Sequence, residues 1–499
     1  MDIERICFFE GEVGKGNKYR WKKVGKSCKI TIYKDGKSKL DDSEEDILGM
    51  IERKITKKIE EFFNSNDKEA LLITGARQVG KTFSIREYGK RCFKNFVEIN
   101  FYENKEAVST IEGFRDTKDL LTRISSLVNC PLEKGNTLVF LDEVQLLPDI
   151  LTAIKFLVDD GRYRYILSGS LLGLELKNIR SIPVGYLAVM EMHPLSIEEF
   201  FLANGLNKSI ISTLKDAYEN SSPVEPYLHE KLMSLFRLYL VVGGMPRAVQ
   251  VYLNTYDLNK VLEEQEYILG RYREDVAQHV GEENLFIKDI FEIIPSELNN
   301  PNKRFILKNL NEKIKFNKYE ESFIWLAKAG IALPVFNVEE PKAPLELNKL
   351  RNLFKFFSND VGLLASQYAQ GIQARILRGD DSINYGCIYE NAVAEELFSN
   401  GLSLFYFNSK KQGELDFVVK IDDSILPIEV KSGKNYSRHN ALKNVMSNDE
   451  YGLKKAIVLT NDNVKMKGNI VYLPVYMAAF IKNSEMGSFI YKVDLSGLT

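Results

Sequence analysis

The chain has 499 residues, of which 44% are hydrophobic and 27% are charged, a composition typical of globular protein. At about 150 residues per domain, this length predicts about three domains, and the apolar content excludes a disordered chain or a small disulfide-stapled scaffold. Lys plus Arg total 67 and Asp plus Glu total 69, so the formal net charge of −2 excludes a protein coated in basic charge. A local basic groove remains compatible with that total.

The five cysteines and four histidines are scattered along the sequence, and none has metal-ligand spacing. An odd number of dispersed cysteines argues against a disulfide framework or a zinc finger and fits a reducing compartment. No apolar run approaches the roughly 18 residues that span a bilayer. Acidic residues at the very start of the sequence also argue against a signal peptide. We therefore expect a cytoplasmic protein without a membrane partner.

Short β-like segments among glycine and lysine residues predict a separate N-terminal appendage over residues 1–45. Within it, Gly11–Gly16 resembles a phosphate loop, but the spacing is too short and no Ser or Thr follows the lysine, so we interpret it as a turn. A helical pattern follows up to Phe63. Strand and helix signals then alternate to about residue 200, which is typical of a parallel sheet covered by helices.

An apolar strand at residues 71–74 runs directly into the sequence Gly-Ala-Arg-Gln-Val-Gly-Lys-Thr, and a helix-like segment follows. This matches the phosphate-binding pattern GxxxxGK[ST] in its required context. The glycines allow successive backbone N–H groups to face phosphate oxygens, and the helix N-terminus favours negative charge. We expect Lys81 to reach the β- and γ-phosphates and the Thr82 hydroxyl to bind Mg²⁺. The predicted nucleotide-binding residues are Gly75, Ala76, Arg77, Gln78, Val79, Gly80, Lys81 and Thr82.

A second buried strand, at residues 137–141, ends in Asp142 and Glu143. Ligands of open α/β sheets bind beyond the carboxyl ends of the strands, so we expect Asp142 to hold Mg²⁺. Glu143 is then expected to act as the general base towards the attacking water. A further strand at residues 164–168 ends in small hydroxyl residues, and Ser168 and Ser170 are the candidates for sensing the γ-phosphate. For Asp142 and Glu143 the alternative is an acidic cap at the end of the strand. For the two serines it is a hydroxyl in an ordinary turn.

Residues 201–283 are rich in helix signals. Residues 284–365 combine three short helical segments with two strands, the pattern of a winged helix whose third helix enters a DNA major groove. The third predicted helix also carries Glu320 and Glu321, which would repel phosphate, so a packing module is the alternative. Basic residues that could contact phosphate precede this helix: Lys303, Arg304, Lys308, Lys313, Lys315 and Lys318.

Two alternating segments near the C-terminus bring acidic and basic residues to one face of a predicted hairpin. Asp416 lies on its first strand and Glu429 and Lys431 on its second, and the alternation points all three to the same side. Glu390 lies on the apolar stripe of a helix, where an unpaired acid is costly. Carboxylates suit Mg²⁺, and a nearby lysine can activate metal-bound water. We therefore predict Glu390, Asp416 and Glu429 as metal ligands and Lys431 as catalytic, with a salt-bridged sheet face as the alternative.

Several of these blocks together resemble a widespread prokaryotic family that joins an AAA-type ATPase of the archaeal-type branch to a C-terminal domain of PD-(D/E)XK nuclease type. The blocks are residues 75–82, 140–145, 167–170, 192–200, 243–246, 273–276 and 355–364. The resemblance covers roughly residues 46–485. It implies an α/β fold, in which a P-loop parallel-sheet ATPase with a helical lid precedes a winged-helix-like region and a restriction-endonuclease-like domain. The expected divisions are 1–45, 46–200, 201–283, 284–365 and 366–499.

The sequence departs from this family at one place. Many relatives carry Gly-Arg before the Pro-Leu block, whereas here Tyr186 follows Gly185. The arginine that would stabilise charge on the γ-phosphate is therefore unassigned, with Arg180, Arg247 and Arg273 as candidates. Such ATPases often use the arginine of a neighbouring subunit, so a homo-oligomer is a further expectation.

Taken together, the motifs predict an ATP-binding and ATP-hydrolysing enzyme coupled to a Mg²⁺-dependent nuclease-like domain, with ATP and Mg²⁺ as cofactors and DNA as a candidate partner. The alternative is a nucleotide-dependent regulatory switch or partner-binding protein, whose nuclease-like domain docks without cleaving. Slow turnover with tight nucleotide retention would favour the second hypothesis.

Overall fold

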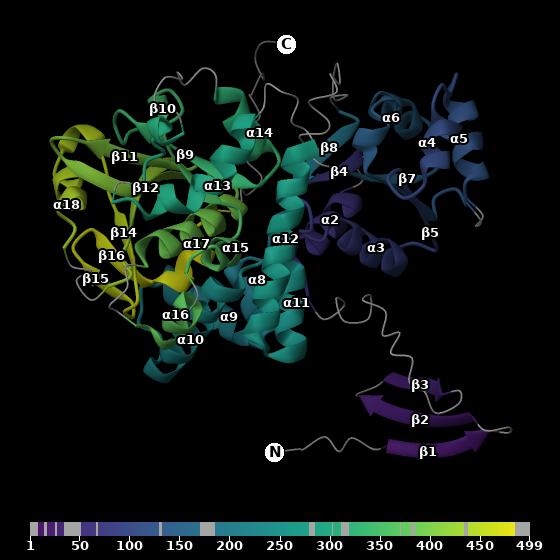
Figure 1. Ribbon diagram of the computed structural model, residues 1–499, viewed down its shortest axis with the longest axis horizontal. Coiled ribbons are helices and arrows are strands. Elements are labelled where there is room, and N and C mark those ends of the chain that lie inside the picture. The colour runs from purple at the N-terminus through teal and green to yellow at the C-terminus, as the bar shows by residue number, and fades with distance from the viewer. Residues whose placement is uncertain are drawn as a thin grey trace, which may run out of the picture. The chain divides into compact units, whose positions relative to one another are not determined.

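The computed structural model describes residues 8–13, 17–24, 27–33, 51–65, 68–128, 132–169, 185–278, 285–301, 303–310, 319–369, 371–380, 385–433 and 438–484. The chain divides into two compact units, residues 1–50 and residues 51–499. The first unit contains a three-stranded antiparallel sheet (Figure 1) formed by β1 (Phe8–Val13), β2 (Asn17–Val24) and β3 (Ser27–Tyr33). The segment that we interpreted as a turn begins inside β1, and its residues 14–16 lie outside the described residues.

The second unit begins with a five-stranded parallel sheet in the order β5–β6–β7–β4–β8. Strands β4 and β6 are apolar and buried along their whole length, as strands covered by helices on both faces must be. The predicted parallel α/β sheet is therefore confirmed. Its strands are β4 (Ala70–Thr74), β5 (Asn95–Asn100), β6 (Thr137–Asp142), β7 (Arg164–Ser168) and β8 (Leu187–Glu191). The accompanying helices are α2 (Lys54–Asn64), α3 (Lys81–Cys92), α4 (Lys105–Ile111), α5 (Thr117–Ser126) and α6 (Asp149–Asp160).

A helical region follows the parallel sheet. Ser196 caps its first helix by accepting a hydrogen bond from the Glu199 N–H, and the Ser196 N–H in turn donates to the Glu199 carboxylate. The helices are α8 (Ile197–Ala203), α9 (Lys208–Glu219), α10 (Pro226–Val242), α11 (Pro246–Thr255) and α12 (Leu258–Gln278). Within the part of the chain that the structure describes, no single helix is long and apolar enough to cross a membrane, and α10 with α11 meets the length and composition only as a pair bent by 120°.

The C-terminal part is built around a mixed eight-stranded sheet in the order β10–β9–β11–β12–β13–β14–β16–β15. Strands β13, β14 and β16 run parallel to one another, and β9 runs parallel to β11. The strands are β9 (Ala332–Val338), β10 (Lys349–Ser358), β11 (Phe405–Ser409), β12 (Gly413–Ile421), β13 (Ser424–Val430), β14 (Ala456–Thr460), β15 (Lys465–Lys467) and β16 (Ile470–Pro474). The helices are α13 (Leu285–Asn299), α14 (Glu320–Lys328), α15 (Val361–Ser366), α16 (Ile372–Arg378), α17 (Gly386–Ser399) and α18 (Asn440–Met446).

The region expected to form a winged helix is part of this larger sheet. Helices α13 and α14 and the β9–β10 hairpin form near their expected places, but the expected middle helix is reduced to a single 3-10 turn at Leu307–Asn309. Strand β9 is mostly buried and pairs with β11, so the expected boundary at residue 365 separates strands of one sheet. Residues 311–318, and with them three of the basic residues expected to contact phosphate, lie outside the described residues.

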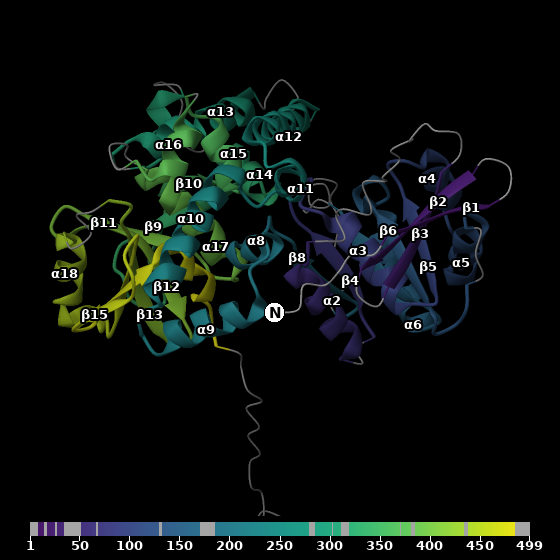
Figure 2. The ribbon, with the colours of Figure 1, turned by 90° about the horizontal axis from the view of Figure 1, so that it is seen from below.

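Helix α17 packs against β10 and β13 of this sheet and also against α10 and α15 (Figure 2). Its acidic residues bond to backbone and side-chain donors of other elements. Glu395 accepts hydrogen bonds from the Tyr239 hydroxyl and the Val361 N–H, both at 2.9 Å. Glu396, which has no exposed surface, accepts one from the Ile197 N–H at 2.8 Å. Burial raises the pKa of Glu396 to about 7.

This burial predicts a pH dependence of stability. The Glu396 carboxyl titrates near 4.5 in the unfolded chain and near 7 in the folded protein. Between these values the folded protein holds a proton that the unfolded chain has lost, so the free energy of unfolding falls as the pH rises. A shift of this size corresponds to about 3 kcal/mol. We expect Glu396→Gln to flatten this slope in urea unfolding measured from pH 4.5 to pH 7.

The matched control is Glu219→Gln, at a half-exposed position on α9. This control should keep the slope of the parent protein. Identical pH profiles for Glu396→Gln and the parent protein would contradict the prediction.

Candidate nucleotide site and carboxylate–lysine cluster

The phosphate-binding pattern forms the loop between β4 and α3. Gly75 has a φ of 136°, and a Cβ there would lie 2.2 Å from the Met192 carbonyl oxygen, so the loop passes too close to the 192–200 segment for any larger residue. Helix α3 begins at Lys81. The unpaired N–H groups of its first turn therefore lie at the loop, the arrangement that binds phosphate.

Lys81 is folded into this loop. Its ammonium donates hydrogen bonds to the carbonyl oxygens of Gly75 at 2.9 Å and of Ala76 at 2.7 Å. Burial lowers the pKa of Lys81, although the Glu143 and Asp142 carboxylates act in the opposite direction. A half-buried ammonium whose hydrogen-bond acceptors are two neutral carbonyl groups fits an anionic ligand such as the phosphates of a nucleotide.

Asp142 accepts hydrogen bonds from several polar groups at the carboxyl edge of the sheet. Strand β7 lies between β4 and β6, so the ends of these three strands meet. Asp142 is 1% exposed and accepts hydrogen bonds from the Thr82 hydroxyl at 3.0 Å, from the Asn100 amide at 3.1 Å and from the Ser168 hydroxyl. Burial raises the pKa of Asp142. The hydroxyl and carboxylate oxygens of Thr82 and Asp142 are the ligand type that Mg²⁺ prefers, so these residues fit the expected ion.

Glu143 follows Asp142 and turns sharply away from the strand. Its φ of 58° is left-handed, a conformation that costs a non-glycine residue about 1 kcal/mol and that is frequent at functional sites. The Glu143 N–H donates to Asp142 at 3.0 Å, and the Gln145 amide donates to the Glu143 carboxylate. The second predicted sensor, Ser170, lies outside the described residues.

Two residues of this site, Asn100 and Gln145, were not predicted from the sequence. Asn100 ends β5 next to β6, so its position at the end of an apolar strand was the available signal. Gln145 lies in the 140–145 block without any spacing rule that points to it.

Helix α12, which follows the parallel sheet in the sequence, contacts the phosphate-binding loop. Asp275 forms an ion pair with Arg77, and the Tyr272 hydroxyl donates to the Arg77 carbonyl oxygen at 3.2 Å. The turn before β9 also reaches the loop, because a Cβ at Gly330 would lie 3.0 Å from the Ala76 nitrogen. The conformation of the loop is therefore linked to elements far along the chain.

Arg53 holds the other side of the loop. It is 7% exposed and donates to the Val79 carbonyl at 2.9 Å, to the His193 carbonyl at 2.6 Å and to the Glu199 carboxylate at 3.1 Å. Burial raises the pKa of Glu199, but the Arg53 and Lys54 charges outweigh burial and hold it below its usual range. Sequence reasoning missed Arg53, because its partner Glu199 lies 146 residues away.

Two of the candidate finger arginines form ion pairs with glutamates in the described structure. Arg247 pairs with Glu264 and Arg273 with Glu292, each at 2.9 Å. Arg180 lies outside the described residues.

The structure brings together Asp416 on β12, Glu429 on β13 and Lys431, which directly follows β13. The Lys431 ammonium donates to the Glu429 carboxylate at 2.6 Å and lies 3.9 Å from an Asp416 oxygen. The Val430 N–H donates to Asp416 at 2.9 Å. The alternation along the two strands, read from the sequence, therefore placed these three side chains on one face.

Glu390 joins this group from α17 but is paired with lysines. It is 2% exposed, the Lys303 ammonium donates to one of its oxygens, and the Lys355 ammonium lies 3.8 Å from the other. Lys355 has no exposed surface and lies 2.7 Å from Glu414. These side chains form a carboxylate–lysine cluster (Lys303, Lys355, Glu390, Glu414, Asp416, Glu429 and Lys431). Lys303 was expected on a phosphate-facing surface but instead belongs to this cluster.

Three carboxyl groups of the cluster have pKa values that are shifted in different directions. Burial, followed by the Asp416 charge, raises the pKa of Glu429 to about 8 and also raises the pKa of Glu390. Burial acts in the same direction on Asp416, but Lys431, Lys355 and Lys303 outweigh it and lower the pKa of that carboxyl. Of Glu390, Asp416 and Glu429, Asp416 is thus the first to ionise as the pH rises.

Among the described residues, no group of three or more His, Cys, Asp or Glu side chains is arranged to hold a metal ion. The set of Glu390, Asp416 and Glu429 is therefore not assembled as a three-ligand site, and lysines pair with Glu390 instead. Asp416 and Glu429 remain beside Lys431 as a pair of carboxylates, which suits an ion that keeps several waters.

Three family models match the chain. They are an AAA domain at residues 67–201, a domain of unknown function (DUF8612) at residues 233–375 and a domain of unknown function (DUF4143) at residues 385–477. The chain is also 24% identical over 447 residues to the uncharacterized protein MJ1637 of Methanocaldococcus jannaschii, covering 84% of this chain and 86% of that protein.

Similar solved structures include the Walker-type ATPase PABY2304 of Pyrococcus abyssi, with 16% identity, a TM-score of 0.39 and coverage of 64% of this chain and 95% of that chain. The Aeropyrum pernix Orc1 protein in complex with DNA has 13% identity, a TM-score of 0.27 and coverage of 67% and 94%. The Thermotoga maritima RuvB branch migration motor has 12% identity, a TM-score of 0.28 and coverage of 61% and 92%. The family match and the loop geometry together identify residues 67–201 as an AAA-type P-loop ATPase domain, followed by two domains of unknown function.

Proposed function

We propose that the protein binds ATP with Mg²⁺ and hydrolyses it at the loop between β4 and α3. The observation that carries the proposal is the 3.0 Å contact between Thr82 and Asp142 beside the half-buried Lys81 ammonium. Thr82 and Asp142 would hold the ion, which supplies positive charge against the phosphate oxygens. On binding, Lys81 would exchange its two carbonyl acceptors for phosphate oxygens. Glu143, fixed by Gln145, would orient the attacking water and take its proton.

Two substitutions separate binding from hydrolysis. Lys81→Ala should abolish nucleotide binding, because it removes the cation that meets the phosphates. Glu143→Gln should keep nucleotide binding but slow phosphate release by about 100-fold or more, the usual contribution of a general base. Nucleotide binding and phosphate release measure the two effects. Lys118→Ala, at an exposed position on α5, is the matched control and should behave as the parent protein. Unchanged turnover in Lys81→Ala would refute the proposal.

We also propose a second activity, Mg²⁺-dependent cleavage of DNA at the carboxylate–lysine cluster. Its support is the placement of Asp416, Glu429 and Lys431 within contact of one another at a buried sheet face. Asp416, kept ionised by its lysine neighbours, would be the main metal ligand together with Glu429. Lys431 would position the attacking water and stabilise negative charge on the phosphate.

The pairing of Glu390 with Lys303 and Lys355 favours a different role for the same domain. A carboxylate already neutralised by two lysines is less open to a metal ion than a free one. In this alternative the C-terminal domain docks a partner without cleaving it, and the ATPase domain acts as a nucleotide-dependent switch.

Asp416→Asn distinguishes the two roles. With Mg²⁺ or Mn²⁺ and several forms of DNA, the parent protein should nick or cut at least one substrate, and Asp416→Asn should lose about 100-fold or more of that rate. ATP turnover should be unchanged in this variant. Asp449→Asn, at an exposed position after α18, is the matched control. Equal, background-level cleavage by the parent protein and Asp416→Asn would leave docking as the role of this domain.

A further inference from the structure

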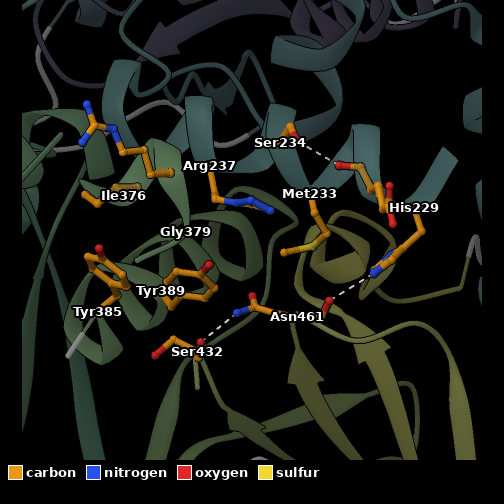
Figure 3. Close-up of a pocket in the computed structure, with 12 residues that line it drawn as sticks. His229, Met233, Ser234, Arg237, Ile376, Gly379, Tyr385, Tyr389, Ser432 and Asn461 are labelled. Atoms are coloured by element: carbon orange, nitrogen blue, oxygen red, sulfur yellow. Dashed lines mark hydrogen bonds between the residues drawn. The ribbon is translucent and has the colours of Figure 1, made fainter. Parts of the chain in front are cut away.

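A cavity of about 480 Å³ lies where α10, α16 and α17 meet the carboxyl ends of the parallel strands β13 and β14 (Figure 3). Ser432 and Asn461, which follow these two strands, form one side of it, and Arg237 of α10 and Tyr389 of α17 form others. The carboxyl ends of parallel strands are where open α/β sheets bind ligands, and this volume suits a nucleotide-sized molecule. None of its lining residues belongs to the phosphate loop.

Arg237 is the cation inside this cavity. Figure 3 shows its side chain extending from α10 into the open space above Tyr389 and Asn461. It is half-buried and has neither a hydrogen bond nor an ion pair with any described residue. Its guanidinium lies against the backbone of Gly379, where a Cβ would be 3.3 Å from Nη1. A half-buried guanidinium without a counter-ion is costly, and its fork of N–H groups suits a phosphate.

The other charged groups around the cavity leave it positive. Arg378, exposed at the end of α16, also pairs with no described residue, whereas the one lining carboxylate, Glu230, is exposed. Both ring nitrogens of His229 are used, by the Tyr476 hydroxyl and the Asn461 carbonyl, each at 3.0 Å. Burial also lowers the pKa of His229, which favours its neutral form, so the two arginines supply the charge.

The cavity borders the carboxylate–lysine cluster along the chain. Ser432 of its wall directly follows Lys431, and Tyr389 directly precedes Glu390. The same helix and the same strand end thus serve both places.

We propose that this cavity binds the phosphate group of a nucleotide unit, with Arg237 as its main donor and Arg378 as a second. The unit comes either from a nucleic-acid strand or from a free nucleotide. The binding site stands without the cleavage activity, and only the assignment of a strand as its source rests on the proposed nuclease function.

The test measures binding to the full-length chain carrying Lys81→Ala, so that the phosphate loop does not contribute. The probes are a short single-stranded DNA oligonucleotide and a free deoxynucleoside monophosphate, both without divalent metal so that no cleavage occurs. Arg237→Gln should weaken binding of at least one probe by about tenfold or more, as expected for a charge-assisted contact. Lys231→Gln, at an exposed position on the same helix, should leave binding nearly unchanged.

The two probes identify the source of the phosphate. Arg237-dependent binding of the oligonucleotide alone assigns a strand, and Arg237-dependent binding of the monophosphate assigns a free nucleotide. Equal binding by Arg237→Gln and its parent, or equal losses in Arg237→Gln and Lys231→Gln, overturns the proposal. Thermal unfolding confirms that Arg237→Gln is folded, and Arg378→Gln, at an exposed position, repeats the test if it is not.

The outcome is separable from that of the nuclease proposal. Arg237-dependent binding with equal cleavage by Asp416→Asn and the parent protein keeps the cavity and rejects the nuclease. Loss of cleavage in Asp416→Asn with normal binding by Arg237→Gln does the reverse.

Discussion

The burial of helix α17 is the constraint on which the rest of the second unit depends. Every residue of this helix from Cys387 to Leu397 is buried, and three of them are glutamates. A buried carboxylate is costly unless it accepts hydrogen bonds, so the elements around the helix must present donors at fixed positions. Glu390 meets lysines of the cluster, Glu395 meets the Tyr239 hydroxyl, and Glu396 meets the backbone that follows β8. The helix therefore fixes the sheet and the helical region to each other.

Hydrogen bonds of a short segment connect helix α17 to the phosphate loop. Ser358 exchanges two hydrogen bonds with Asn391 of α17, at 2.8 and 3.1 Å. The next residue, Asn359, donates to the Tyr272 hydroxyl at 3.2 Å, and Tyr272 in turn donates to the Arg77 carbonyl. Asn391 follows Glu390 of the cluster directly. The loop and the cluster are thus joined by a path of hydrogen bonds and adjacent residues, which supplies a physical route for coupling.

The sequence predicts a structural feature of this protein when the residues that form the feature lie close together along the chain. The loop from Gly75 to Thr82 depends on spacing within one strand–loop–helix unit, so its position and the parallel sheet around it could be read directly. Asp416, Glu429 and Lys431 were placed together because a hairpin of alternating residues is also local. Their further partners were not predictable, since Lys303 lies 87 residues from Glu390 and no pattern marks it as the partner of a buried carboxylate.

The architecture differs from expectation where a feature depends on residues far apart in the sequence. The β9–β10 hairpin was recognisable from its own residues, but its pairing with β11 joins segments separated by the whole of α17. A local pattern of helices and two strands suits a separate winged helix equally well. Only the need of a buried strand for partners on both edges decides between the two, and that need becomes visible once the neighbouring strands are placed.

The charge content of the carboxylate–lysine cluster bears on why it is there. Taking Lys355 out of water entirely carries a large desolvation cost, which its neighbours Glu390 and Glu414 offset. Apolar residues of similar volume usually stabilise such a site as well or better, so stability alone does not account for so many buried charges. Lys303 and Lys355 hold Glu390 while Lys431 keeps Asp416 ionised, so a cation reaching Asp416 would meet a carboxylate already charged. That division of roles favours a site that handles a charged ligand over a sheet face held together by salt bridges.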